Sequence, residues 1–168
     1  MHSLCSHPSR RHFRRRLAQV LAVMDTSIRP IEFDSAAEAL LSSCHLPTSD
    51  LSGSSKVLLF GHAPDGTLTG MVGLEMHGAN ALLRSLAVTE SHRSTGLGAK
   101  LASCAEQQAA VLGAHAVYLL TTTADKFFER RGYVHASRNE APASIARTSQ
   151  FSELCPSSSA FMVKRLNG

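Results

Sequence analysis

The chain has 168 residues, with 17 Lys and Arg against 13 Asp and Glu, which gives a formal net charge of +4. Residues 1–23 contain five arginines and no acidic residue, so residues 24–168 keep twelve basic against thirteen acidic side chains. A hydrophobic content of 43% is enough for one domain with a buried core and argues against a disordered chain or a repeat array. No apolar run reaches the roughly 18 residues that a membrane-spanning helix needs. We therefore expect one near-neutral domain over 24–168 that has no membrane partner.

The first 23 residues carry the basic charge. The apolar stretch after the arginines is interrupted by Gln19 and is too short for the hydrophobic region of a secretory signal. Five arginines offer contacts to phosphates but none that reads a base. Since Met24 is followed by what looks like the start of a domain, we interpret residues 1–23 as a disordered basic extension or an over-called start. Export and nucleic-acid binding by this segment stay open as alternatives.

The cysteines and aromatic residues bear on compartment and partners. The four cysteines lie far apart and form neither a CxxC pair nor a cluster with histidines: Cys5, Cys44, Cys104 and Cys155. This favours a reducing, cytoplasmic location and predicts no metal site. The lack of tryptophan and an aromatic content of 5% weigh against a stacking surface for nucleic acid, so we expect no nucleic-acid partner.

From residue 24 the pattern begins with a short strand, a helix and three further strands. Asp34 followed by Glu38 predicts the start of the helix, which runs through Leu41. The segments with strand character are 27–31, 56–62, 69–77 and 81–88. Turns rich in Gly, Pro and Asn join the last three, which predicts an antiparallel meander.

After Val88 the pattern changes to alternating helices and strands. A helix over 97–112, with apolar residues at helical spacing, is followed by a strand over 115–121. A strand–helix–strand unit of this length is most simply parallel and right-handed. The remaining segments are a helix over 124–131, a strand over 133–137, an interrupted helical stretch over 141–154 and a last strand over 160–166. The whole predicts an α+β, or mixed α/β, fold around a central mixed sheet.

The loop Arg93-Ser94-Thr95-Gly96-Leu97-Gly98-Ala99 joins the meander to the long helix. Gly96 and Gly98 let the backbone approach a ligand closely, and the unpaired N–H groups of the first helical turn suit an anion such as a pyrophosphate. Arg93 adds positive charge. The pattern is neither a Rossmann GxGxxG nor a Walker GK[ST] motif. A tight turn without a ligand is the alternative.

The segment LLRSLAVTESHRSTGLGAKL, followed by a strand and then by ADKFFERRGY, resembles the GNAT family of acetyl-CoA-dependent N-acetyltransferases. The resemblance implies an acyl-CoA N-acyltransferase fold whose RxxGxG loop holds the pyrophosphate of coenzyme A, with acetyl-CoA as co-substrate. It implies that the Val88 N–H polarises the acetyl carbonyl. Phe128 stands where the family often has the tyrosine that protonates the leaving thiolate, so that role is unfilled. The expected cofactor-binding residues are Leu86, Ala87, Val88, Arg93, Ser94, Thr95, Gly96, Leu97, Gly98, Ala99, Phe127 and Phe128.

Three longer stretches, residues 73–88, 118–133 and 141–158, are similar to the GNAT subfamily encoded in bacterial arsenic-resistance operons. The resemblance covers nearly the whole domain. It implies acetyl transfer to the amine of a small molecule, with an arsenic-related or amino-acid-like toxic compound as the expected acceptor. A homodimer is left open.

Glu75 and Arg84 are charged residues in otherwise apolar strands. Glu75 is the candidate base that removes a proton from the acceptor amine, with a solvent-facing residue or the partner of an arginine as alternatives. Arg84 either fixes an acidic group of the acceptor through its bidentate fork or neutralises Glu75. If His77 pairs with Leu82, Glu75 lies opposite Arg84, whereas a one-residue slip puts them on opposite faces.

The remaining candidates lie at the end of the parallel strand and in the C-terminal segment. Thr121 is the candidate proton donor, and Tyr118 is an alternative for the missing tyrosine. Thr123 is expected to cap the following helix or to touch the acceptor. The residues expected to line the acceptor site are Arg84, Ser85, Thr123, Arg138 and Phe151. A non-catalytic sensor that keeps the coenzyme A fold and binds an arsenical through Cys155 is the alternative function.

Overall fold

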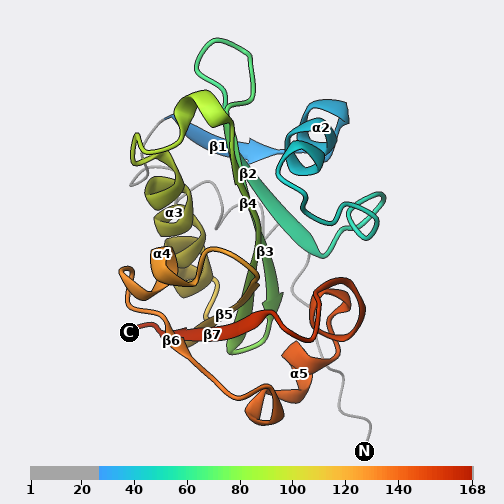
Figure 1. Ribbon diagram of the computed structural model, residues 1–168, viewed down its shortest axis with the longest axis vertical. Helices are drawn as coiled ribbons and strands as arrows, with labels where there is room; N and C mark the ends of the chain where they lie inside the picture. The colour runs from blue at the N-terminus through green and yellow to red at the C-terminus, as the bar shows by residue number, and fades with distance from the viewer. Residues whose placement is uncertain (1–26, 168) are drawn as a thin grey trace, which may run out of the picture.

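Seven strands form one sheet in the order β1–β2–β3–β4–β5–β7–β6 in the computed structural model, which describes residues 27–167 (Figure 1). The strands are β1 (Ile28–Ile31), β2 (Val57–His62), β3 (Gly70–His77), β4 (Asn80–Val88), β5 (Ala116–Thr121), β6 (Val134–His135) and β7 (Ala160–Arg165). The helices are α2 (Ser35–Ser43), α3 (Leu97–Val111), α4 (Asp125–Glu129) and α5 (Ala143–Ala146). Short helical turns are η1 (Glu90–His92), η2 (Arg138–Glu140) and η3 (Gln150–Leu154). The expectation about residues 1–23 lies outside the described residues.

The sheet is mixed, as predicted. Strands β1 to β4 are antiparallel neighbours, and Gly78, with a φ of +66°, forms the tight turn between β3 and β4. β4 and β5 run parallel on either side of the crossover through α3, and β7 then inserts between β5 and β6. The predicted mixed α/β fold class is therefore confirmed.

Helices cover both faces of the sheet (Figure 1). α3 and α4 lie over one face, where α3 buries the predicted stripe of Leu97, Leu101, Ala105 and Ala109. A Cβ added to Gly70 would lie 2.8 Å from Cδ1 of Leu101, so this glycine lets α3 approach β3 closely. α2 and the segment that contains α5 lie over the other face, which we call the α2 face. Within 27–167, the structure contains no helix long and apolar enough to cross a membrane.

Local hydrogen bonds decide where two of the predicted helices begin and end. The start of α2 is capped as predicted, because Oδ1 of Asp34 accepts the Ala37 N–H at 2.9 Å. The interrupted helical stretch predicted over 141–154 is observed as two separate segments, α5 and η3. Thr148 accounts for the break, since its hydroxyl donates to the Ile145 carbonyl at 2.7 Å and competes with the helical N–H groups for that acceptor.

β4 contains a bulge at Ser85 and Leu86. The flanking pairs with β3 are Gly73 with Arg84 and Met71 with Ala87. Ser85 accommodates the extra residue by adopting the left-handed region, with a φ of +55°. The bulge shifts the alternation of side chains, so Ala87 packs under α2 while Leu86 and Val88 pack against the cluster under α3.

Candidate functional site

β4 and β5 stop pairing before either strand ends. Their parallel pairs are confined to Asn80–Leu82 of β4 and Ala116–Tyr118 of β5. Beyond these pairs, the described sheet gives residues 83–88 no partner on the β5 side, so backbone N–H and C=O groups on that edge of β4 are left for a ligand or water. This stretch contains the predicted cofactor residues at its end.

The loop between β4 and α3 has the conformation of an anion site. Gly96 and Ser94 are both in the left-handed region, with φ values of +86° and +61°. The first hydrogen bond of α3 runs from the Lys100 N–H to the Gly96 carbonyl at 3.1 Å, so the N–H groups of residues 97–99 precede the helical ladder. They lie at the positive end of a helix of 15 residues. The predicted Ser94–Ala99 segment is thus shaped to hold an anionic group.

The side chains of this loop hold its shape. Nε of Arg93 donates to the Val88 carbonyl at 3.3 Å, and Nη2 of Arg93 contacts Sγ of Cys44 at 3.8 Å. The Thr95 hydroxyl donates to the His92 carbonyl. These bonds place the charge of Arg93 between the end of β4 and the end of α2.

Phe127 lies beside the loop, whereas Phe128 does not. A Cβ added to Gly98 would lie 3.7 Å from Cζ of Phe127 and 3.8 Å from Cγ2 of Val88, so these residues border the same space. Phe128 is 4% exposed and packs edge-to-face against Phe127 and Tyr133 in the core. The surroundings of Phe128 therefore do not support its predicted contact with the cofactor.

Thr121, rather than Thr123, satisfies the backbone at the start of α4. The Thr121 hydroxyl accepts the Ala124 N–H at 3.0 Å and keeps its own proton available for donation, whereas Thr123 is exposed. Tyr118 pairs with Leu82, so it lies on the α2 face, and the alternation along β5 puts Thr121 on the α3 face. The two candidate proton donors are therefore on opposite sides of the sheet.

Glu75 and Arg84 lie on the same face without being directly opposite. Glu75 pairs with Leu82, and His77 with Asn80, a register two residues away from the one that would put Glu75 opposite Arg84. An even shift keeps both side chains on one face. Arg84 reaches diagonally, and its Nη1 donates to Oε1 of Glu75 at 2.8 Å. Glu75 is 8% exposed and Arg84 5%.

Arg84 is held mainly by Asp50, a residue that the sequence patterns did not indicate. Nη1 and Nη2 of Arg84 donate to the two oxygens of Asp50 at 2.5 and 2.7 Å, and Nε donates to Oγ of Ser85 at 3.3 Å. Burial alone would raise the pKa of Asp50, but its hydrogen bonds and charge interaction with Arg84 hold this pKa below the ordinary value. Of the two roles predicted for Arg84, the contacts favour the neutralising one, because its fork is occupied by Asp50 and Glu75. Asp50, Glu75, His77 and Arg84 are called the carboxylate network below.

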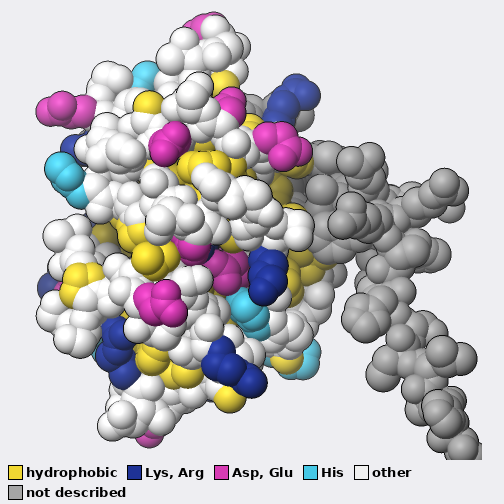
Figure 2. Space-filling model, turned by 90° about the vertical axis from the view of Figure 1, so that its right-hand side faces the viewer, with side chains coloured by type: hydrophobic (Ala, Val, Ile, Leu, Met, Phe, Trp, Pro, Cys, Tyr) yellow, Lys and Arg dark blue, Asp and Glu magenta, His cyan; other side chains and the backbone are white. Residues whose placement is uncertain are grey.

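Arg138 and Phe151, both predicted, lie next to this network. Nη2 of Arg138 donates to the Phe151 carbonyl at 3.0 Å, and its guanidinium carbon lies 4.4 Å from the centre of the Phe151 ring. Gln150, which is buried beside Phe151, accepts from the Cys155 thiol at 3.5 Å and lies against Asp50. The face seen in Figure 2, which carries α2 and α5, gathers acidic, basic and histidine side chains near its centre, between hydrophobic ones.

The Cys155 thiol is a poor candidate for arsenic or metal binding. Burial raises its pKa, even though the charges of Arg84 and Arg138 act in the opposite direction. A raised pKa disfavours the thiolate, which is the form that binds such ions. This weighs against the non-catalytic sensor.

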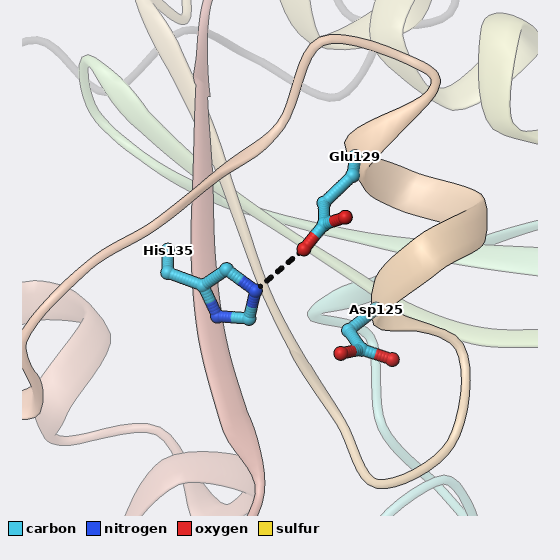
Figure 3. A group of neighbouring side chains, drawn as sticks. All are labelled: Asp125, Glu129 and His135. Carbon is cyan, nitrogen blue, oxygen red and sulfur yellow. Dashed lines mark hydrogen bonds and ion pairs between the residues drawn. The ribbon is translucent and has the colours of Figure 1, made fainter.

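Asp125, Glu129 and His135 form a separate surface group, shown in Figure 3. Their ligand atoms lie within 4.8 Å of one another, a spacing that a divalent cation tolerates. Nε2 of His135 is already 3.0 Å from one oxygen of Glu129, and Nζ of Lys126 is 3.2 Å from the other. The hydrogen bond from His135, with that from Lys126, lowers the pKa of Glu129. The group is a partly exposed ion-pair cluster away from the carboxylate network, and the structure gives no further support for a metal there.

Acyl transfer from an anionic carrier to an amine needs a place for the carrier and a base for the amine proton. The loop of residues 93–99, called the donor loop below, has the conformation for the first, and the carboxylate network contains a candidate for the second. This is the layout of an acyl-coenzyme A N-acyltransferase. The family model described as acetyltransferase (GNAT) family matches residues 26–133. The chain belongs to this family. No curated protein matches the chain in sequence.

Solved structures share the fold at low sequence identity. N-acetylglutamate synthase from Neisseria gonorrhoeae, complexed with coenzyme A and N-acetyl-glutamate, is 21% identical with a TM-score of 0.67 over 84% of this chain and 35% of that chain. Rv2747 from Mycobacterium tuberculosis, in complex with CoA, is 18% identical with a TM-score of 0.66, covering 83% and 99% of the two chains. An aminoglycoside 6'-N-acetyltransferase complexed with coenzyme A is 16% identical with a TM-score of 0.61, covering 82% and 96%. The chain spans about a third of the length of the synthase. These likenesses show the fold alone.

Proposed function

We propose that the protein transfers the acetyl group of acetyl-CoA to the amine of a small, amino-acid-like molecule. The observation that carries this proposal is the buried carboxylate of Glu75, which has one oxygen on Arg84 and the other on His77. In a domain of this family, a buried carboxylate that exchanges protons with solvent through a histidine is suited to act as the base.

On the donor side, the proposal assigns the coenzyme to the loop and the end of β4. The N–H groups of residues 97–99 and the guanidinium of Arg93 would hold the pyrophosphate. By family resemblance, the Val88 N–H would polarise the acetyl carbonyl. Phe127 and Gly98 would border the coenzyme where α4 approaches the loop.

On the acceptor side, the amine nitrogen attacks the thioester carbonyl, so that a C–N bond forms and the C–S bond breaks. Glu75 takes the proton of the amine, directly or through a water, and Nη1 of Arg84, 2.8 Å from Oε1 of Glu75, holds the carboxylate in place. His77, whose side chain is 23% exposed, connects this proton to solvent. The leaving thiolate takes a proton from the Thr121 hydroxyl or from water.

We further propose that the acceptor carries an acidic group near its amine: a carboxylate, a phosphinate or an arsenic oxyacid. Two observations support this. Arg138, which is held by Phe151, has an Nη1 without a hydrogen-bond partner among residues 27–167, and one structural neighbour was crystallised with N-acetyl-glutamate. The arsenical is included because of the sequence similarity to the arsenic-resistance subfamily. A cytoplasmic location is proposed because Cys44, Cys104 and Cys155 are free thiols.

Binding of acetyl-CoA tests the donor side. Calorimetry and thermal shift with acetyl-CoA are expected to show binding to the wild-type protein, and weaker binding to Gly96→Pro and Gly98→Asp. Release of the CoA thiol, followed with a thiol reagent, then tests turnover on amino acids, aminoglycosides, and phosphinate- or arsenic-bearing amino acids. Undiminished binding in both glycine variants, or no thiol release with any amine, would contradict the proposal.

A further inference from the structure

We propose that Arg138, and not Arg84, binds the acidic group of the acceptor, and that it is the residue that makes the enzyme select amino-acid-like amines. This inference rests on the proposed function, which it deepens by assigning the acceptor's acid to a definite side chain.

Arg84 cannot take this part without giving up its own partners. Its two terminal nitrogens are used by Asp50 and Glu75, its Nε is used by Ser85, and its side chain is 1% exposed. An acidic acceptor would have to displace the carboxylate of Asp50, which binds the same fork in the bidentate geometry that the acceptor would need. Asp50 thus occupies the site on Arg84 that the acidic group of the acceptor would need.

Arg138 has the free donor that Arg84 lacks. Its Nη2 is fixed by the Phe151 carbonyl at 3.0 Å, and its guanidinium stacks on the Phe151 ring. Its Nη1 is buried and has no hydrogen-bond partner among residues 27–167. A buried charged donor without an acceptor is costly, and an acidic oxygen would satisfy it. The stack leaves the planar fork already oriented, so little order is lost when an anion binds.

Arg138 also lies in the neighbourhood of the base. Phe151, which holds it, follows Gln150, and Gln150 lies against Asp50. The thiol of Cys155 lies close enough to feel three charges of this region, those of Arg84, Arg138 and Asp50.

The charges of this region leave one opposite pair for the acceptor. Asp50 and Arg84 neutralise one another, so Glu75 remains as an anion and Arg138 as a cation. An amino acid presents an ammonium and an acid on neighbouring atoms, which matches this pair in sign. The site therefore fits a zwitterionic acceptor better than a simple amine.

Two matched substrate pairs test the inference: L-glutamate with 4-aminobutyrate, and L-methionine with 3-(methylthio)propylamine. Each pair has the same amine with and without the α-carboxylate. We expect the wild-type enzyme to prefer the α-amino acid over the compound without the α-carboxylate in at least one pair. Arg138→Gln should raise the KM for that α-amino acid about tenfold to a hundredfold and should change the KM for its partner little. Arg138→Lys should restore only part of the preference, because a lysine lacks the fork. Arg147→Gln is the control, since Arg147 is exposed on the same segment and should leave both KM values unchanged.

The outcomes separate this inference from the proposed function. Thiol release with unchanged preference for the acid in Arg138→Gln would overturn the inference and leave the acetyltransfer intact. If Asp50→Glu loses the preference for the α-carboxylate and Arg138→Gln keeps it, the acidic group is bound by Arg84, the partner of Asp50. That result would also overturn the inference. No thiol release from any amine in the wild-type enzyme would overturn both. Melting temperatures of all variants show whether a loss of turnover reflects unfolding instead.

Discussion

Nε2 of His77 lies 3.1 Å from Oε2 of Glu75, and the two side chains lie on the same face of β3 with the histidine nearer to solvent. The carboxylate is therefore linked to water by one hydrogen bond, although it is almost fully buried. A base placed in this way can pass a captured proton outward and regain its charge for the next turnover.

Replacing Glu75 by glutamine should lower kcat by about 10²- to 10⁴-fold, because an amide cannot accept the amine proton. The KM for acetyl-CoA should change little, since the donor loop is at the other end of β4. Steady-state thiol release at saturating acetyl-CoA measures this. Glu38→Gln is the control, because Glu38 is exposed in the first turn of α2. Equal kcat values in the two variants would remove Glu75 from the mechanism.

Replacing Gly96 by valine should weaken acetyl-CoA binding about tenfold or more, since the φ of +86° strains any β-branched residue and the loop must relax. Gly66→Val is a matched control. Gly66 has a φ of +78° in the turn between β2 and β3, outside the donor loop, and a Cβ at either glycine has nothing within 4 Å. Both variants should lose about 1–2 kcal/mol of stability, but only Gly96→Val should raise the KM for acetyl-CoA. A comparable rise in Gly66→Val would show that the effect is general.

Asp50 should make stability depend on pH in the acid range. Its pKa is lower in the folded protein than in the unfolded chain, so its contribution is fully present above the ordinary value of about 3.8 and is lost as pH falls through the folded pKa. Asp50→Asn should therefore lower the free energy of unfolding at pH 7 and reduce its fall between pH 5 and pH 3. Urea unfolding at several pH values tests this. Parallel curves for the two proteins would show that Asp50 has no such role.

Introducing a hydroxyl at residue 128 should not restore a proton donor. Phe128 is 4% exposed and packs on Tyr133, so Phe128→Tyr would bury a phenol and cost about 1–3 kcal/mol if the hydroxyl finds no partner. Its kcat should stay at or below the wild-type value. Thr121→Val tests the alternative, and a fall in its kcat is expected if the Thr121 hydroxyl protonates the thiolate. A clear rise in kcat for Phe128→Tyr would place residue 128 at the reacting sulfur.

Most of the fold could be predicted from the sequence, because its signals are local. The apolar stripe of α3 and the Asp34 cap each act within a few residues, and the structure agrees with both of them. The donor loop was visible for the same reason. The interruption of the helical stretch over 141–154 was predicted as well, and Thr148, whose hydroxyl donates to the Ile145 carbonyl, lies at the break.

The carboxylate network could be predicted only in part. Strand patterns indicated Glu75 and Arg84, since charges in apolar strands need partners. They could not indicate Asp50, which comes from an irregular loop 34 residues away in sequence. One signal was available: a buried guanidinium has five N–H donors, more than a single carboxylate can satisfy, so a second acid was to be expected. Nothing in the sequence said which acid it would be.

The bulge in β4 lets a single strand serve two layers of the molecule. Before Ser85, a residue of even number such as Arg84 points to the α2 face; after it, Val88 points to the α3 face. Removing one residue at this position would reverse the second half of the strand and turn the Val88 side chain, and the edge groups beside it, away from the coenzyme loop. The number of residues between Arg84 and Val88 thus decides which face of the sheet each side chain points to. A relative with the same motifs but one residue fewer between them would need a different catalytic arrangement.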